Sequence, residues 1–245
     1  MSGPKIDGFA ARTAVIDVGP LLIDGRTALV AVLAIALALV HLVADEFPLS
    51  DLVSRPLWLT AAGGVSVAYV FVHLFPKLDA HASSIDAVPL LSASLHSHHV
   101  YLFAGVGLAS FYGLERLAQV AKTHEVSGAT PLHTDEPVFW VHVASFSAYN
   151  AFVGYLLVSG ELVGEEIAFS VAMALHLLGN DEGMRNHHRE AYHRFGRWVL
   201  AAAVLVGTVI GFVVAIGDAA LTIALAIFAG GSSSTRSKRS SPRIA

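Results

Sequence analysis

Apolar residues in this chain gather into long runs separated by short polar segments. Windows of about 19 residues pick out the runs Thr27–Val43, Leu57–Phe75, Val100–Leu117, Pro137–Ser159, Leu162–Leu178, Trp198–Ile216 and Ala219–Ala229. About 20 apolar residues suffice to cross the ~30 Å hydrocarbon core of a bilayer as an α-helix. The pattern therefore predicts an all-α fold, a polytopic membrane helix bundle with about seven transmembrane helices.

Three boundaries in this pattern shape the expected organisation. Pro76 is expected to close the second run, because proline disrupts a helix interior. The last run has only about 11 apolar residues, so it must extend back through Gly217–Asp218 or stay incomplete. After Gly231 the chain turns abruptly polar. We therefore expect one transmembrane domain over residues 1–230 and a polar, disordered tail over residues 231–245.

Composition supports the membrane assignment and excludes some chemistry. Of the 245 residues 55% are hydrophobic and 14% are charged, and the mean hydropathy is +0.64. The chain has no cysteine, which excludes disulfides, thiolate metal sites and iron–sulfur clusters. The net charge of −4 is too small to suggest nucleic acid as a partner.

Lysine and arginine are unevenly shared between the two sides of the predicted bundle. The side of the N-terminus carries Lys5, Arg12, Arg26 and Lys77. The opposite side carries Arg55, Arg116, Lys122, Arg185, Arg189, Arg194 and Arg197. Because cytoplasmic loops hold the excess of positive charge, we expect a cell-membrane protein with its N-terminus outside.

Histidines within or beside the apolar runs are the first candidates for function, since ionisable groups at membrane depth are usually functional. They are His41, His73, His142 and His176. His73 lies three residues before Pro76, which leaves carbonyls one turn back without their usual donor. This predicts either a polar notch for an ion or a simple hydrogen bond to a neighbouring helix. His41 and Asp45, one turn apart, are interpreted as an interfacial, structural pair.

Two further clusters join imidazoles to amides and carboxylates. His142 and Asn150 are eight residues apart and share one helix face, so this polar stripe either binds an ion or fastens helices together. His176 and Asn180 are one turn apart, and Asp181 and Glu182 follow directly. That stretch is the densest ligand-like group in the chain, unless it is only a helix end stopped by glycine.

Two predicted loops are rich in histidine. The stretch His81–His99 is expected outside and the stretch Asn180–Arg197 inside. Exposed histidine and carboxylate clusters can capture divalent cations loosely, but an ordinary solvated loop explains them equally well.

The run Gly63–Pro76 (GGVSVAYVFVHLFP) resembles the second helix of the ZIP (Zrt/Irt-like) family of divalent metal transporters, and Ala168–Gly183 is similar to that family's fifth helix. The resemblance implies a metal site between the second, fourth and fifth helices. The chain departs from the family at Phe146, where a histidine is usual, and at Asn150, where a carboxylate is usual. A site with two bridging carboxylates is therefore not expected.

The resemblance also bears on the end of the chain. Where the family enters its last helix, this chain has the polar residues 232–245. Codons for those residues, read two bases later, encode a plausible start of a membrane helix. One hypothesis is therefore a frameshift that removed a last helix, and the alternative is an ordinary cytoplasmic tail.

Together these observations predict a transporter or binder of divalent metal cations, zinc above all, rather than an enzyme. The expected metal ligands are His73, His142, Asn150, His176, Asn180, Asp181 and Glu182. No organic cofactor is expected. The expected partners are the lipid bilayer, the metal ion and, in a homodimer, a second copy of the chain. The alternatives are a b-type haem protein that uses His41, His142 or His176, or a membrane bundle without transport whose histidines only bond between helices.

Overall fold

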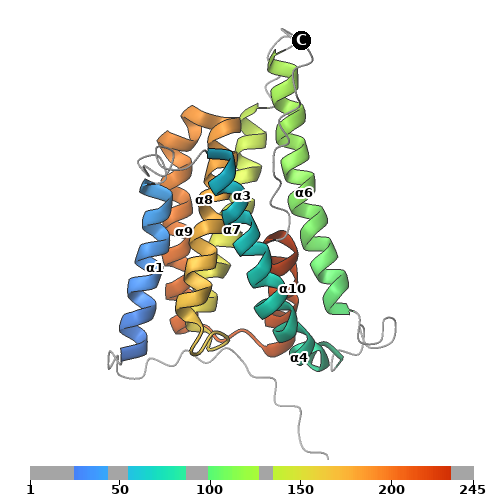
Figure 1. Ribbon diagram of the computed structural model, residues 1–245, viewed down its shortest axis with the longest axis vertical. Coiled ribbons are helices and arrows are strands. Elements are labelled where there is room, and N and C mark those ends of the chain that lie inside the picture. Colours follow the sequence, from blue (N-terminus) through green and yellow to red (C-terminus); the bar gives the residue numbers. More distant parts are fainter. Residues whose placement is uncertain (1–24, 44–54, 87–98, 127–134, 233–245) are drawn as a thin grey trace, which may run out of the picture.

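The computed structural model describes residues 25–43, 55–86, 99–126 and 135–232, and all regular secondary structure in these ranges is helical. The helices are α1 (Gly25–Val43), α3 (Arg55–Tyr69), α4 (Phe75–Asp86), α6 (His99–Val126), α7 (Asp135–Val158), α8 (Glu166–Ala191), α9 (Arg197–Val213) and α10 (Asp218–Ser232). Two π-helical turns, η1 (Val70–Leu74) and η2 (Tyr192–Gly196), join α3 to α4 and α8 to α9. The predicted all-α bundle is confirmed (Figure 1). Residues 233–245, on which the tail and frameshift hypotheses depend, lie outside the described ranges.

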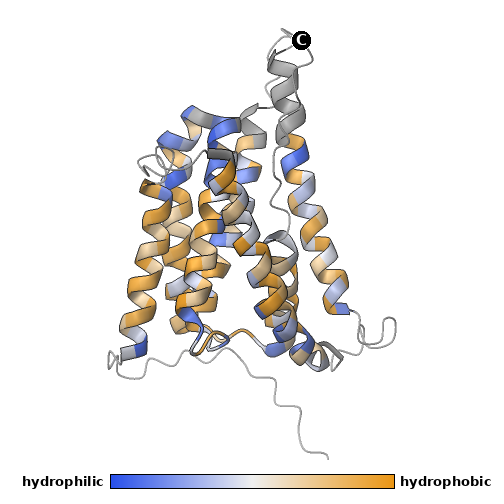
Figure 2. Ribbon diagram, in the orientation of Figure 1, coloured by the Kyte–Doolittle hydropathy of each residue, from blue (hydrophilic) through white to orange (hydrophobic). Residues whose placement is uncertain are grey.

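Four helical stretches are long and apolar enough to cross a membrane. They are Gly25–Val43, Leu57–Ser84, Phe139–Val158 and Tyr192–Val213. Figure 2 shows hydrophobic residues along the length of α1 and α9 and hydrophilic residues at the two ends of the bundle. A membrane bundle is therefore supported, while seven crossings and the orientation of the N-terminus stay predictions.

The second predicted run is longer than the sequence suggested, because Pro76 does not end it. Pro76 lies inside the continuous helix Leu57–Ser84, directly after Phe75, the residue that follows the π-helical turn η1. Proline has no backbone N–H to donate, and the helix adjusts by widening into η1, where the N–H of Phe75 donates to the carbonyl of Val70. His73 lies inside this wide turn, and His81, predicted in a loop, lies in α4.

The predicted inner loop Asn180–Arg197 is also helical. α8 continues past Gly183 to Ala191 and connects through η2 to α9, with a kink at His188 (φ −138°, ψ 47°). The predictions of a loop here and of a helix stop at Gly183 were wrong. A glycine inside a helix lowers its stability by only about 1 kcal/mol, and the packing of α8 against α1 and α3 outweighs that.

Glycines permit the closest helix contacts. The ideal Cβ of an alanine at Gly154 would lie 2.0 Å from the carbonyl oxygen of Val204, and one at Gly207 would lie 1.8 Å from that of Ala151. α7 and α9 therefore pack backbone to backbone, which is typical of helix pairs in membranes. Gly107 of α6 meets α10 in the same way, 2.0 Å by the same measure from the carbonyl oxygen of Ile227.

Candidate functional site

A buried ion pair joins α1 to α8 in the interior of the bundle. Nδ1 of His41 lies 2.9 Å from both carboxylate oxygens of Asp181, and both side chains are fully buried. Nε2 of His41 lies 3.0 Å from Oδ1 of Asn150 on α7. Three helices thus meet through one imidazole. We call His41, Asp181 and Asn150 the polar triad.

The hydrogen bonds of the triad define the charge on the imidazole. Nδ2 of Asn150 donates to the carbonyl of Phe146 at 2.8 Å, which orients the Asn150 oxygen toward His41. The Asn150 oxygen only accepts, so Nε2 of His41 carries a proton, and with Asp181 ionised Nδ1 carries a second one. In that state the triad contains an imidazolium and a carboxylate, and their charges cancel.

A second polar group surrounds His176. Its Nδ1 lies 3.0 Å from the hydroxyl of Ser66 on α3, and its ring centroid lies 5.4 Å from that of Tyr149 on α7. The hydroxyl of Tyr149 in turn bonds the hydroxyl of Ser232, the last residue of α10. Ser232 of α10 is therefore linked through Tyr149 to the surroundings of a buried imidazole.

The predicted cluster at the end of Ala168–Gly183 does not act as one unit. Asp181 belongs to the triad, while the carboxylate of Glu182 accepts from Arg185 and Asn186, each at 2.8 Å. Nδ2 of Asn180 is buried and has no hydrogen-bond partner in the described part of the chain.

His142 and His73 lie apart from both groups. The His142 ring is buried, and its centroid is 5.6 Å from that of His188, which is about 18 Å along α8 from His176 at ~1.5 Å per residue. The His73 ring stacks on Tyr69, and its Nδ1 lies 3.7 Å from a carboxylate oxygen of Glu165. The predicted ligands therefore occupy three levels of the bundle. Among the described residues no three histidine or carboxylate side chains converge as a metal site would require.

A set of charged residues gathers at the end of the bundle where α7 turns into α8. Lys77 lies 3.2 Å from a carboxylate oxygen of Glu165 and also donates to the carbonyl of Glu161. Arg26 pairs with Glu166, the first residue of α8, at 3.0 Å. Burial alone would raise the pKa of the Glu166 carboxyl, but backbone N–H groups and the Arg26 guanidinium together hold that pKa below its ordinary value.

The structure adds residues that the sequence interpretation missed. His41 was paired with Asp45, which lies outside the described ranges, whereas its imidazole bonds to Asp181, 140 positions away in the chain. One signal was present: Val30, Ala34, Leu37, Ala38 and His41 follow the spacing of one helix face, and all five are buried. Such a stripe indicates that His41 faces the bundle rather than the membrane surface. Ser66 and Tyr149 carried no comparable signal.

The three histidines proposed for haem have different neighbours, since His41 binds Asp181, His142 lies beside His188 and His176 binds Ser66. Comparison with protein-family models, with curated proteins and with solved structures finds no match to this chain.

Proposed function

We propose that the protein binds divalent metal cations, zinc foremost, within the membrane and moves them across it. The observation that carries this proposal is the fully buried triad of His41, Asp181 and Asn150 inside an apolar bundle. Ionisable side chains at membrane depth are costly to bury and mark ion pathways or partners. Here they combine the imidazole, carboxylate and amide oxygen that first-row divalent ions accept as ligands.

The surroundings of the triad support an ion pathway. The buried hydroxyls of Ser66 and Tyr149 lie next to His176, and Tyr149 bonds the buried Ser232. Polar groups buried among membrane helices mark ion pathways or partners. The unsatisfied amide of Asn180 adds a further polar group on the same helix as Asp181.

In the arrangement described, the positive imidazole of His41 occupies the space between Asp181 and Asn150. A cation can use these three groups as ligands only after the His41 ring loses a proton and moves out of the gap, since an imidazolium offers no lone pair. This accounts for the absence of a converged metal site in the described residues. In our proposal the described conformation is closed, and transport includes a second arrangement of α1 against α8.

A second function is favoured by the same contacts. Because both nitrogens of His41 are engaged, the triad can serve as a fastener between α1, α7 and α8 in a membrane protein that moves no ion. The two functions differ in whether the triad responds to metal.

Zinc flux into proteoliposomes tests the proposal. The purified full chain should admit zinc, and Asp181→Asn, which removes the negative charge but keeps the shape, should lower the maximal rate at least about tenfold. Asp79→Asn is the matched control, because Asp79 bonds Tyr101 on the exposed surface. Flux in Asp181→Asn equal to that of the natural chain, or no flux in the natural chain, would refute transport through the triad.

Asn150→Asp separates the two functions. It restores a carboxylate where the ZIP family has one, so a cation site should gain zinc affinity and zinc should raise the melting temperature of the variant more than that of the natural chain. A fastener should show the same melting temperature with and without zinc in both proteins.

A further inference from the structure

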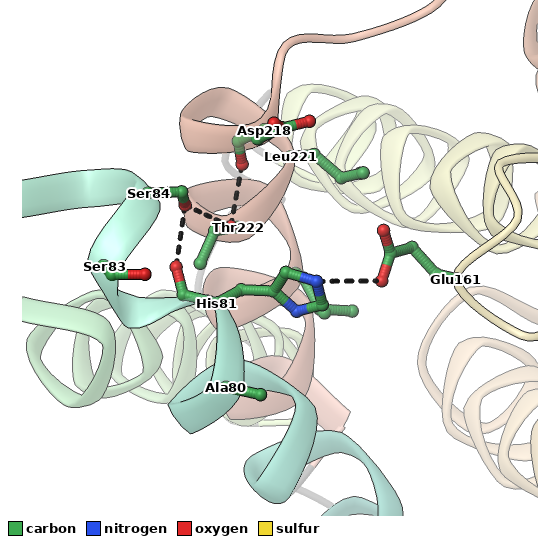
Figure 3. Close-up of a pocket in the computed structure, with 9 residues that line it drawn as sticks. Ala80, His81, Ser83, Ser84, Glu161, Asp218, Leu221 and Thr222 are labelled. Atoms are coloured by element: carbon green, nitrogen blue, oxygen red, sulfur yellow. Dashed lines mark hydrogen bonds and ion pairs between the residues drawn. The ribbon is translucent and has the colours of Figure 1, made fainter. Parts of the chain in front are cut away.

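A cavity opens at the end of the bundle where α4, α10 and the turn between α7 and α8 meet (Figure 3). Its volume is about 230 Å³, and its polar lining comprises His81, Ser83, Ser84, Glu161, Asp218 and Thr222. These residues lie on segments far apart in the sequence, so the fold itself assembles the cavity. None of them is among the expected metal ligands or part of the triad.

His81 is held in one orientation inside this cavity. Its Nδ1 lies 2.9 Å from the carbonyl oxygen of Lys77, one turn earlier in α4. A carbonyl only accepts, so Nδ1 carries the proton, and Nε2 of a neutral ring presents a lone pair. Metal-binding histidines are commonly oriented in this way, by a backbone carbonyl on the other ring nitrogen.

Nε2 of His81 faces a carboxylate oxygen of Glu161 at 3.8 Å (Figure 3). That distance is too long for a direct hydrogen bond. When the ring is neutral, two acceptors face each other across this gap. Zinc binds imidazole nitrogen at ~2.0–2.1 Å and carboxylate oxygen at ~2.0–2.2 Å, so a bridged pair lies at most about 4.3 Å apart. The gap therefore matches the space that one bridging cation requires.

The charges around the gap favour a cation over an anion. The ammonium of Lys77 contacts the backbone carbonyl of Glu161 and the side chain of Glu165. In the described part of the chain His81 is the partner of the Glu161 carboxylate. Asp218 adds a second negative charge to the lining. The hydroxyls of Ser84 and Thr222 donate to the backbone carbonyls of His81 and Asp218 and lie 3.0 Å from each other. Water can complete the coordination of a cation.

We propose that His81 and Glu161 bind one divalent transition-metal cation in this cavity, as a weak capture site at this end of the bundle. Two protein ligands with water hold a metal less tightly than a closed site of four ligands, as suits a site that must release its ion. The proposal goes beyond the transport function, because the cavity can bind a cation whether or not the triad moves one.

Zinc binding to the purified full chain in detergent, measured by calorimetry, tests the site. His81→Gln and Glu161→Gln should each remove or weaken one binding event at least about tenfold. The double variant should bind no more weakly than either single variant, because the first change already destroys the shared site. Asp79→Asn and His193→Gln should bind as the natural chain does. Single variants with natural affinity, or losses that multiply in the double variant, would overturn the proposal.

A gain of affinity distinguishes a shared cation from a plain ion pair. Glu161→His offers a second imidazole across the same gap, so it should bind zinc at least as tightly as the natural chain, whereas an ion pair would be lost as in Glu161→Gln. Equal weakening in both variants would contradict the proposal.

Flux measurements separate this site from the triad. Cavity variants should raise the half-saturating zinc concentration about tenfold at an unchanged maximal rate, whereas Asp181→Asn lowers the maximal rate. If the natural chain shows no flux while the cavity variants still bind zinc more weakly than it does, transport is refuted and the capture site is not. Unchanged affinity in those variants would refute the capture site alone.

Discussion

Replacing His41 by leucine should destabilise the bundle more than the small change in side-chain volume explains. The change leaves the Asp181 carboxylate fully buried without its cation and takes the donor from Oδ1 of Asn150. Two unit charges about 4 Å apart attract by about 4 kcal/mol at an effective dielectric constant of ~20. Removing one partner of a buried pair accordingly costs about 3–5 kcal/mol, since the other charge stays uncompensated. We expect a loss in that range for His41→Leu.

The double variant His41→Leu/Asp181→Leu should recover most of this loss. It removes both charges together and leaves apolar side chains in an apolar bundle, a replacement that is often neutral or stabilising. The oxygen of Asn150 then lacks a donor, which costs about 1–3 kcal/mol. We therefore expect the double variant to lie closer to the natural chain than His41→Leu does.

The coupling is the difference between the loss in the double variant and the sum of the losses in His41→Leu and Asp181→Leu. Unfolding free energies of these three variants and the natural chain, from denaturing-detergent titrations in mixed micelles, give it directly. A coupling of several kcal/mol is the expected result. Single losses below about 1 kcal/mol that add up in the double variant would refute the reasoning, because that is the range of exposed pairs. In that case His41 would not be an imidazolium facing a carboxylate.

Three other changes follow from the packing and the charged end of the bundle. Gly207→Ala should lower the unfolding free energy in the same titration by about 1–3 kcal/mol or more, because its Cβ would meet a backbone oxygen at 1.8 Å; Gly105→Ala, with nothing within 4 Å, should not. Tyr149→Phe should cost about 1 kcal/mol through the lost bond to Ser232. The lowered pKa of the Glu166 carboxyl predicts that its ionised form stabilises the fold above pH 4.5 and that this stabilisation disappears as acid protonates it. The difference in unfolding free energy between the natural chain and Glu166→Gln should therefore fall toward zero below that pH. A difference independent of pH would contradict this.

The apolar pattern predicted helices where the structure has its four candidate spans, since each of the runs Thr27–Val43, Leu57–Phe75, Pro137–Ser159 and Trp198–Ile216 lies largely within one of them. Hydropathy reports length and burial in lipid, and these properties decide where such helices form. It does not report how a helix adjusts at its ends. The continuation through Pro76 depends on the wide turn η1, which the helix propensities of the single residues do not predict.

The site could be predicted only as far as single helices determine it. Spacing within one helix correctly placed His142 and Asn150 toward the interior, and both are buried. The partner of a polar side chain, however, depends on which helices become neighbours. The bond from His41 to Asp181 and the cavity contact between His81 and Glu161 both join distant segments, so a single sequence without a fold contains no direct sign of them.

The attachment of α6 has a consequence for how the protein is made. α6 stands at one side of the bundle and packs mainly against α10 (Figure 1), through contacts as close as that of Gly107 with the Ile227 carbonyl. The ribosome completes α6 roughly a hundred residues before it completes α10, at about 5–20 residues per second. During those seconds α6 lacks its main packing partner and has only its smaller contacts with α4, α7 and α8. Assembly of the bundle is therefore finished only when its last described helix arrives.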